Sequence, residues 1–162
     1  MKLSSGELLL RSRPADMDLL RRLAFTLAGC GRGADALRHA ARACELQPHD
    51  PRTWSDHGCV LALFGELRAA AIRFRAAIDV DGKFAVGWHN LGVALARLGQ
   101  SRDACRAYRN ALAFDEDCAQ TWFALGKLLA DVGLPERAMT IFDRAERLAA
   151  RTPLSFTIPA VL

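Results

Sequence analysis

The sequence lacks the features that mark membrane proteins, secreted proteins and nucleotide-binding enzymes. No apolar run approaches the roughly 18 residues that a membrane-spanning helix requires. The apolar run 8–10 is followed at once by Arg11 and Arg13, which leaves no room for the apolar core of a signal peptide. The glycine-rich patterns GxGxxG and GxxxxGK(S/T), which cradle nucleotide phosphates, are missing as well. These absences favour a cytoplasmic protein.

Paired metal or disulfide ligands are also lacking. The 5 cysteines make an odd count and none is spaced as CxxC, whereas a disulfide framework or a zinc ribbon needs paired, regular spacing. We therefore expect reduced thiols that pack like small apolar side chains. None of the 4 histidines has a partner three or four residues along a helix that would complete a metal site. With no nucleophile–base pair either, the sequence predicts a protein without metal, cofactor or enzymatic activity.

The positive charge is not concentrated in one place. The formal net charge is +4 and the excess is spread along the chain. Binding to a phosphate backbone requires clustered Lys and Arg, so nucleic acid is not the expected partner, and the lack of a long apolar run likewise predicts no membrane partner. Repeated units could still bring basic side chains from distant segments into line, and that alternative stays open here.

What the sequence does have is a period of 34 residues. Trp54, Trp88 and Trp122 coincide when the chain is shifted against itself by one period. A fixed period of this length indicates stacked copies of one supersecondary unit. The other coinciding sets are Gly58, Gly92 and Gly126; Gly31, Gly65, Gly99 and Gly133; Ala36, Ala70, Ala104 and Ala138; and Ala43, Ala77, Ala111 and Ala145.

Each unit is predicted to be a helix–turn–helix hairpin. With Met17 in the first slot, four units follow: 17–50, 51–84, 85–118 and 119–152. Apolar residues at slots four, seven, eight and eleven form one face of a helix, and glycine at slot fifteen ends that helix. The second helix carries Ala, an aromatic residue four positions on, and Ala again, as in Ala70, Phe74 and Ala77. Neither helix buries its apolar face without the next unit.

These residues resemble the signature of the tetratricopeptide repeat family. The pattern W-x2-L-G-x2-(Y/L), followed by A-x3-(F/Y), occurs at 88–95 with 104–108 and at 122–129 with 138–142. The resemblance covers 17–152 and implies an all-α fold, a right-handed superhelical solenoid of antiparallel helix pairs. Unit two departs at His57, where Leu is expected, so we predict an interior, hydrogen-bonded histidine. Unit one departs at Leu20, Ala24 and Ala40.

The two ends of the chain differ from the repeats. Residues 4–13 occupy the place of a second helix, with Ser4 and Glu7 spaced as a capping box, so 1–16 is predicted to be an N-terminal half-repeat that covers unit one. Residues 153–162 form an apolar, β-prone tail whose two prolines oppose a helix.

The resemblance also indicates where a partner would bind. In similar arrays a second stripe on the first helix of each unit, at slots two, five, six, nine, twelve and thirteen, lines a concave inner surface that holds extended peptides or helices. Here that stripe is mostly apolar with basic edges, which suits a partner with apolar anchors and some acidic character. The predicted partner-binding residues are Arg21, Phe25, Arg52, Cys59, His89, Asn90, Val93, Arg97, Phe123 and Lys127.

Two sharper resemblances fail on this stripe. The clamp for chaperone tails and the asparagine ladder of sugar-transferring enzymes each need several asparagines or lysines at fixed slots, and only Asn90 matches. The leading hypothesis is therefore a non-catalytic adaptor that binds a segment of a partner protein in its groove. The alternatives are a secretion-type chaperone, self-assembly into a homo-oligomer through the C-terminal tail, and the repeat portion of a larger enzyme such as a glycosyltransferase.

Overall fold

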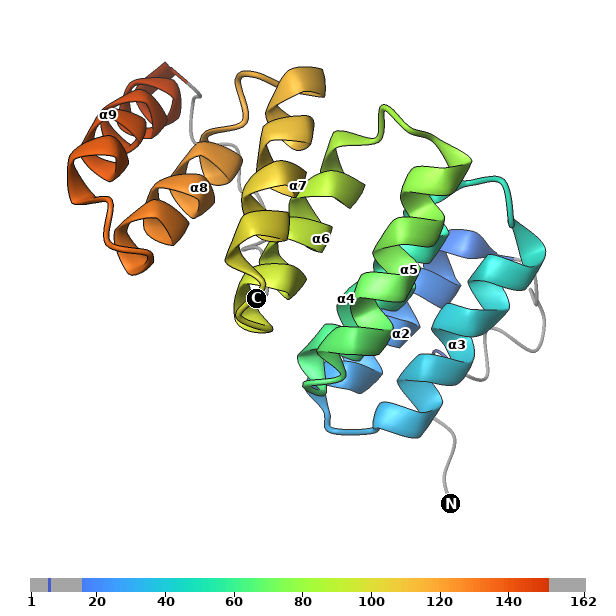
Figure 1. Ribbon diagram of the computed structural model, residues 1–162. Helices are drawn as coiled ribbons and strands as arrows, with labels where there is room; N and C mark the ends of the chain where they lie inside the picture. The colour runs from blue at the N-terminus through green and yellow to red at the C-terminus, as the bar shows by residue number, and fades with distance from the viewer. Residues whose placement is uncertain (1–5, 7–15, 152–162) are drawn as a thin grey trace.

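The computed structural model describes residue 6 and residues 16–151 of the chain. This part is all-α: four antiparallel helix pairs follow one another and stack side by side into a superhelical array (Figure 1). Each pair lies within one of the predicted 34-residue units. The helices are α2 (Met17–Gly29), α3 (Gly33–Leu46), α4 (Pro51–Leu63), α5 (Leu67–Val80), α6 (Ala85–Arg97), α7 (Ser101–Phe114), α8 (Ala119–Asp131) and α9 (Pro135–Arg151).

Both predicted end segments fall largely outside the described residues. Of the half-repeat 1–16, only Gly6 and Asp16 are described. Gly6 is helical, and a Cβ added to it would lie 2.5 Å from Leu23 Cδ2 of α2. The tail 153–162 lies wholly outside the described residues, so its role stays a prediction.

Glycine ends the first helix of every unit, as predicted. The four glycines at slot fifteen have φ between +74° and +81°, a left-handed conformation that side chains with a Cβ rarely adopt. In unit one the N–H of Gly31 donates to Ala28 O and the N–H of Arg32 donates to Leu27 O. The same two bonds recur in the other three units. This is the Schellman motif, which satisfies the last carbonyl groups of the helix and reverses the chain.

Within a unit, a glycine on the first helix lets an aromatic side chain of the second helix come close. A Cβ added to Gly92 would lie 2.6 Å from the ring of Tyr108, closer than real Cβ contacts allow. Gly58 and Gly126 face Phe74 and Phe142 in the same way. Unit one carries Ala24 and Ala40 at these two slots instead, and both are buried. Relative to the other units, unit one therefore has a larger residue in the glycine slot and a smaller residue in the aromatic slot, so that the two differences compensate.

The tryptophans tie each unit to the loop that precedes it. Their rings are half-buried, and each indole N–H donates to a carbonyl six residues earlier. An orphan carbonyl of the connection between units is thereby satisfied. The three bonds join Trp54 to Pro48 at 2.9 Å, Trp88 to Gly82 at 2.9 Å and Trp122 to Glu116 at 2.7 Å.

The buried core runs along the array. One apolar cluster extends over units two to four and includes Phe74 and Tyr108, while a second cluster covers unit one and reaches Val60 of α4. Helices α7 and α8 pack together less extensively than the corresponding helices at the other two junctions. None of the described helices combines the length and the apolar character needed to cross a membrane.

His57 lies in the interior, which confirms the prediction made for it. Its Nδ1 is 3.8 Å from Cys44 Sγ, across the junction between units one and two. Burial, with a smaller contribution from the charge of Arg73, lowers the pKa of His57 to about 4. The ring is therefore neutral in the folded protein at neutral pH, as a packing position requires.

The first prediction concerns the close contact between glycine and ring. Gly92→Ala should lower the free energy of unfolding by about 1–3 kcal/mol because the new methyl group overlaps Tyr108. Gly29→Ala is the matched control, because a Cβ there meets nothing within 4 Å. Chemical denaturation of both variants measures the difference. The double variant Gly92→Ala/Tyr108→Ala reproduces the pair found in unit one and should cost less than the sum of its parts; strict additivity would contradict the assigned contact.

The second prediction concerns acid stability. The unfolded chain protonates His57 near pH 6.5, whereas the folded chain does so only near pH 4. The stabilisation from the neutral ring is complete above pH 6.5 and is lost as the pH falls toward 4. His57→Leu should therefore gain stability relative to the wild type between pH 6.5 and 4 in urea titrations. His49→Leu, at an exposed position, controls for the loss of a histidine. An equal pH dependence in wild type and His57→Leu would refute the shift.

Candidate functional site

The predicted stripe lies on the first helix of each unit, on α2, α4, α6 and α8. Its ten predicted partner-binding residues divide by exposure. Those that are half-buried are Phe25, Cys59, His89, Asn90 and Val93. Those that are exposed are Arg21, Arg52, Arg97, Phe123 and Lys127. The exposed side chains are therefore mainly basic, with one aromatic ring.

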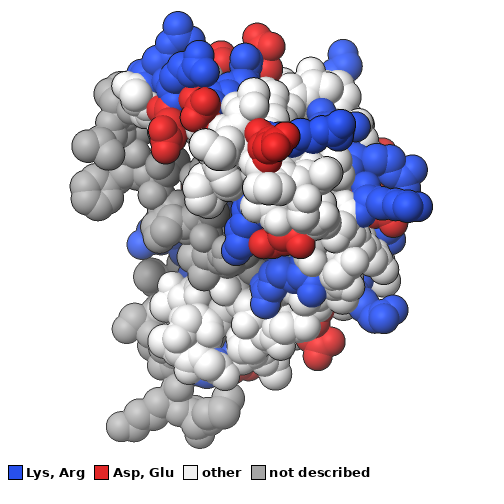
Figure 2. Space-filling view, turned by 60° about the vertical axis from the view of Figure 1, so that its left-hand side comes forward, with Lys and Arg blue, Asp and Glu red and all other residues white. Residues whose placement is uncertain are grey.

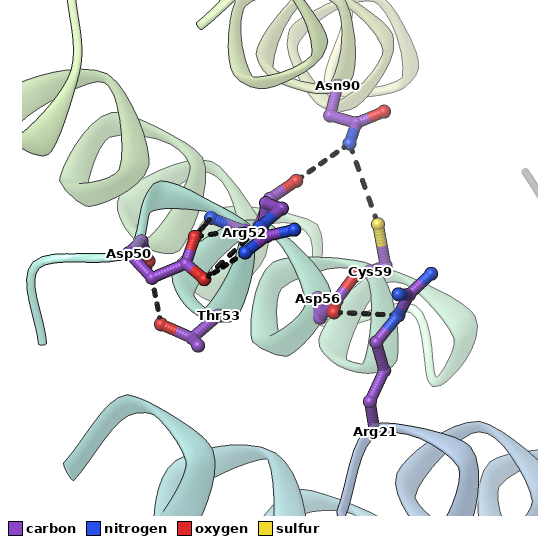
Figure 3. Close-up of polar contacts among 8 residues, drawn as sticks. Arg21, Asp50, Arg52, Thr53, Asp56, Cys59 and Asn90 are labelled. Carbon is purple, nitrogen blue, oxygen red and sulfur yellow. Dashed lines mark hydrogen bonds and ion pairs between the residues drawn. The ribbon is translucent and has the colours of Figure 1, made fainter. Parts of the chain in front are cut away.

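Polar side chains of this stripe bond to one another from unit to unit. Arg21 Nε lies 3.2 Å from a carboxylate oxygen of Asp56, which joins α2 to α4. Asn90 Nδ2 on α6 donates to Ser55 Oγ at 3.0 Å and to Cys59 Sγ at 3.6 Å, which joins α4 to α6 (Figure 3). We call these contacts, with the one described next, the inter-unit ladder. They hold successive first helices in a fixed register.

The ladder changes at the last junction. His89 occupies the slot of Arg21 and Ser55, but its counterpart on α8 is Ala124, which has no polar side chain. His89 Nδ1 instead lies 2.9 Å from Thr121 Oγ1. One hydrogen bond thus joins α6 to α8 at their N-terminal halves, and the stripe beyond it is free of such links in the described residues.

The ladder was not predicted from the sequence. The sequence does contain a signal for it. Arg21 and Asp56 have opposite charges and are 35 positions apart, which is one period plus one residue. Ser55 and Asn90 are two polar residues with the same separation. The pairs join neighbouring slots of successive units, so a comparison of identical slots does not bring them together. Arg52 is likewise engaged, with Asp50, the last residue of unit one and the N-cap of α4, at 2.9 Å. The basic edge of units one and two is therefore largely paired.

Burial controls the ionisation of the ladder residues. It raises the pKa of Asp56 to about 6, against the opposing effect of Arg21. Burial and the nearby Asp56 carboxylate raise the pKa of Cys59 to about 12, so this thiol is not ionised at neutral pH. Burial also lowers the pKa of His89. The Cys59 thiol is therefore a packing and hydrogen-bonding group rather than a nucleophile.

An open groove of about 890 Å³ lies between units three and four. It brings together five of the ten predicted residues: His89, Val93, Arg97, Phe123 and Lys127. The groove does not include the other five. We call this cavity the inner groove. Its remaining walls come from α7, with Tyr108, and from α9, with Ala145 and Glu146.

The inner groove has an apolar floor and a rim of mixed charge. Phe123 is 58% exposed, and its ring lies 5.3 Å from that of Phe142, centroid to centroid. Arg97 and Lys127 stand on the rim with Asp131 and Glu146. On the face shown in Figure 2, basic side chains likewise form separate clusters with acidic ones between them. The groove can hold an apolar side chain and offer a carboxylate two cationic partners.

No group of three or more His, Cys, Asp or Glu side chains within residue 6 and residues 16–151 is placed to hold a metal ion. The five cysteines are all free, and Cys30 alone is exposed.

Two models of the tetratricopeptide repeat match the chain, one over residues 85–118 and the other over residues 119–152. Together these ranges contain both sides of the inner groove. No curated protein matches the sequence.

Solved structures resemble the chain in fold. The crystal structure of MamA has a TM-score of 0.74 and 17% identity, covering 93% of this chain and 97% of that chain. A structure of MamA from Desulfovibrio magneticus RS-1, beginning at residue 41, has a TM-score of 0.72 and 19% identity, with coverages of 87% and 80%. YrrB, described as a TPR protein with an unusual peptide-binding site, has a TM-score of 0.67 and 19% identity, with coverages of 91% and 76%. At these identities the likeness concerns the fold.

The third prediction separates a ladder residue from a groove residue. Asn90→Ala removes the bonds to Ser55 and Cys59 and should lower the free energy of unfolding by about 1–2 kcal/mol. Phe123→Ser alters an exposed ring and should cost clearly less. Thermal or urea unfolding of the two variants tests this order. If Asn90→Ala unfolds like the wild type, the ladder does not hold the units together.

Proposed function

The chain belongs to the tetratricopeptide repeat family, whose stacked units form protein-interaction scaffolds, and we propose that its inner groove binds a segment of a partner protein. The observation that carries the proposal is the inner groove itself. Five residues chosen from the sequence as partner contacts line one cavity of about 890 Å³. A cavity of this size accommodates one or two large side chains of a bound peptide.

The chemistry of the groove suggests the character of the partner. Val93 and Phe123 provide apolar surface, and burial of an exposed aromatic ring favours binding by about 25 cal/mol per Å². Arg97 and Lys127 lie beside this surface and would attract a carboxylate. The opposite charges of Asp131 and Glu146 would disfavour a uniformly acidic segment. The preferred partner therefore has an apolar anchor with a nearby acidic residue, as an extended peptide or a helix.

The ladder explains why binding is assigned to the C-terminal half of the stripe. In units one and two, polar side chains at the centre of the stripe already have partners, namely Arg21 with Asp56 and Ser55 with Asn90. A ligand there would have to displace these bonds. In unit four the ninth slot carries exposed Lys127 and the fifth carries exposed Phe123. These side chains can contact a ligand without breaking an existing link.

The proposed role is that of a non-catalytic adaptor. Two polar residues of the stripe support it. The Cys59 thiol is neutral at neutral pH, and the ring of His89 forms a hydrogen bond with Thr121. The cytoplasmic location and self-assembly through the tail 153–162 remain predictions.

The fourth prediction tests the inner groove by capture of a partner from a lysate of the source organism. Phe123→Ser and Arg97→Glu should each abolish retention of a partner that the wild type retains, because they remove the anchor surface and reverse a rim charge. Ile72→Ser is the matched control: Ile72 is 60% exposed on α5, away from the groove. Circular dichroism confirms that all variants are folded. Equal retention by Phe123→Ser and the wild type would move binding to another surface.

A further inference from the structure

A second cleft lies on the other side of α8 from the inner groove. It has a volume of about 720 Å³ and is walled by α7, α8 and α9. Helix α8 faces it with Trp122, Leu125 and Leu129, whereas it faces the inner groove with Phe123 and Lys127. We call it the outer cleft. The cleft lies at the junction where α7 and α8 pack less extensively than the corresponding helices at the other two junctions.

The floor of the outer cleft is apolar. It consists of Leu112 from α7, Leu125 and Leu129 from α8, and Ile141 from α9, with the ring of Trp122 at one side. Leu125 is 4% exposed and Leu112 is 8% exposed, so these side chains also belong to the core. A cleft of this kind can receive one large apolar side chain without a rearrangement of the core.

Three arginines surround this floor: Arg109, Arg137 and Arg144. None of them forms an ion pair with a carboxylate in the described part of the chain, and the guanidinium of Arg144 lies 4.8 Å from the centroid of the Trp122 ring. Other arginines on second helices do have such partners: Arg42 pairs with Glu45 and Arg106 with Asp103. The three cations at the outer cleft thus retain their capacity to bind an anion.

This set of arginines occurs at one junction only. At the junction of units two and three the same slots carry Arg75, Asp103 and Asn110. At the junction of units one and two all three slots carry alanine. The repeat framework does not require arginine there, because two other junctions pack without the set.

We propose that the outer cleft binds an acidic peptide segment through one large apolar side chain. The apolar side chain would occupy the floor, and flanking carboxylates would pair with Arg137, Arg144 and Arg109. Guanidinium groups bind carboxylates through two parallel hydrogen bonds, and such pairs are stronger beside apolar surface than in open water. Stacking on Trp122 already orders the side chain of Arg144, which reduces the entropy lost on binding.

The same features disfavour nucleic acid as the occupant. A phosphate backbone has no apolar side chain for the floor, and Glu116 lines the cleft beside Asp115 and Asp117 of the adjoining loop. These acids leave room for a few carboxylates near the arginines but repel an extended polyanion. The proposal concerns a different surface from the inner groove, so either can fail without the other.

The indole N–H signals of the three tryptophans provide a test by ¹H–¹⁵N NMR. All three indoles bond in the same way, but only Trp122 borders the outer cleft. The probe is a synthetic nine-residue peptide with a central phenylalanine, one glutamate on each side of it and serine at the other positions. It should shift the Trp122 signal, assigned with Trp122→Phe, and leave those of Trp54 and Trp88 in place. Peptides with alanine for phenylalanine, or with amides for carboxylates, should bind at least about tenfold more weakly.

Variants in which glutamine replaces two arginines complete the test. Arg137→Gln/Arg144→Gln should weaken the peptide at least about tenfold, since each substitution removes a charge-assisted pair. Arg68→Gln/Arg75→Gln, at exposed positions of α5, loses the same charge and should bind like the wild type. The proposal is overturned if the Trp122 signal does not move, if both double variants bind equally, or if Arg97→Glu rather than Arg137→Gln/Arg144→Gln abolishes the shift.

Discussion

The array depends on the absence of a side chain at the eighth slot of the unit. Because Gly92 has no Cβ, the ring of Tyr108 lies directly against the backbone of α6. This contact sets how closely the two helices of a hairpin approach, and therefore which residues of the first helix point away from its partner. The stripe that lines the inner groove is what remains exposed once this contact is made. Unit one has Ala24 in the slot of the glycine and Ala40 in the slot of the ring, and both are buried. There the added methyl group of Ala24 is accommodated because Ala40 is smaller than an aromatic residue.

The contacts inside a unit could be read from the sequence because they recur in fixed slots. Helix pairs, glycine turns and the interior position of His57 all follow from local spacing and hydrophobic pattern. The inter-unit ladder could not be read in this way. Whether Ser55 meets Asn90 depends on the rotation and rise between successive units, which a period of 34 residues does not specify. Asn90 was predicted to contact a ligand, whereas the structure gives it partners within the array; its contact with a ligand remains untested.

The same limitation applies to the groove. The sequence predicted a stripe along four helices, mostly apolar with basic edges, and its predicted contacts were spread over all four units. The structure makes the units unequal. Arg21 and Asp56 link the first two units, whereas Ala124 gives His89 no partner in the corresponding slot. That one small residue lines the cavity and leaves His89 bonded to Thr121 nearer the start of α8, so the inner groove occurs where the link between units is displaced.

Helix α8 forms a wall of both cavities at the last junction, and its position is fixed from two directions. The indole of Trp122 holds its first turn to the loop at Glu116, and the turn at Gly133 fixes its end. Thr121 links the same first turn to His89 across the junction. A wall held in this way loses little conformational freedom when a ligand binds. At the junction where α7 packs less extensively against α8, the outer cleft therefore lies beside a helix that is itself firmly anchored, which is the arrangement that a preformed binding surface requires.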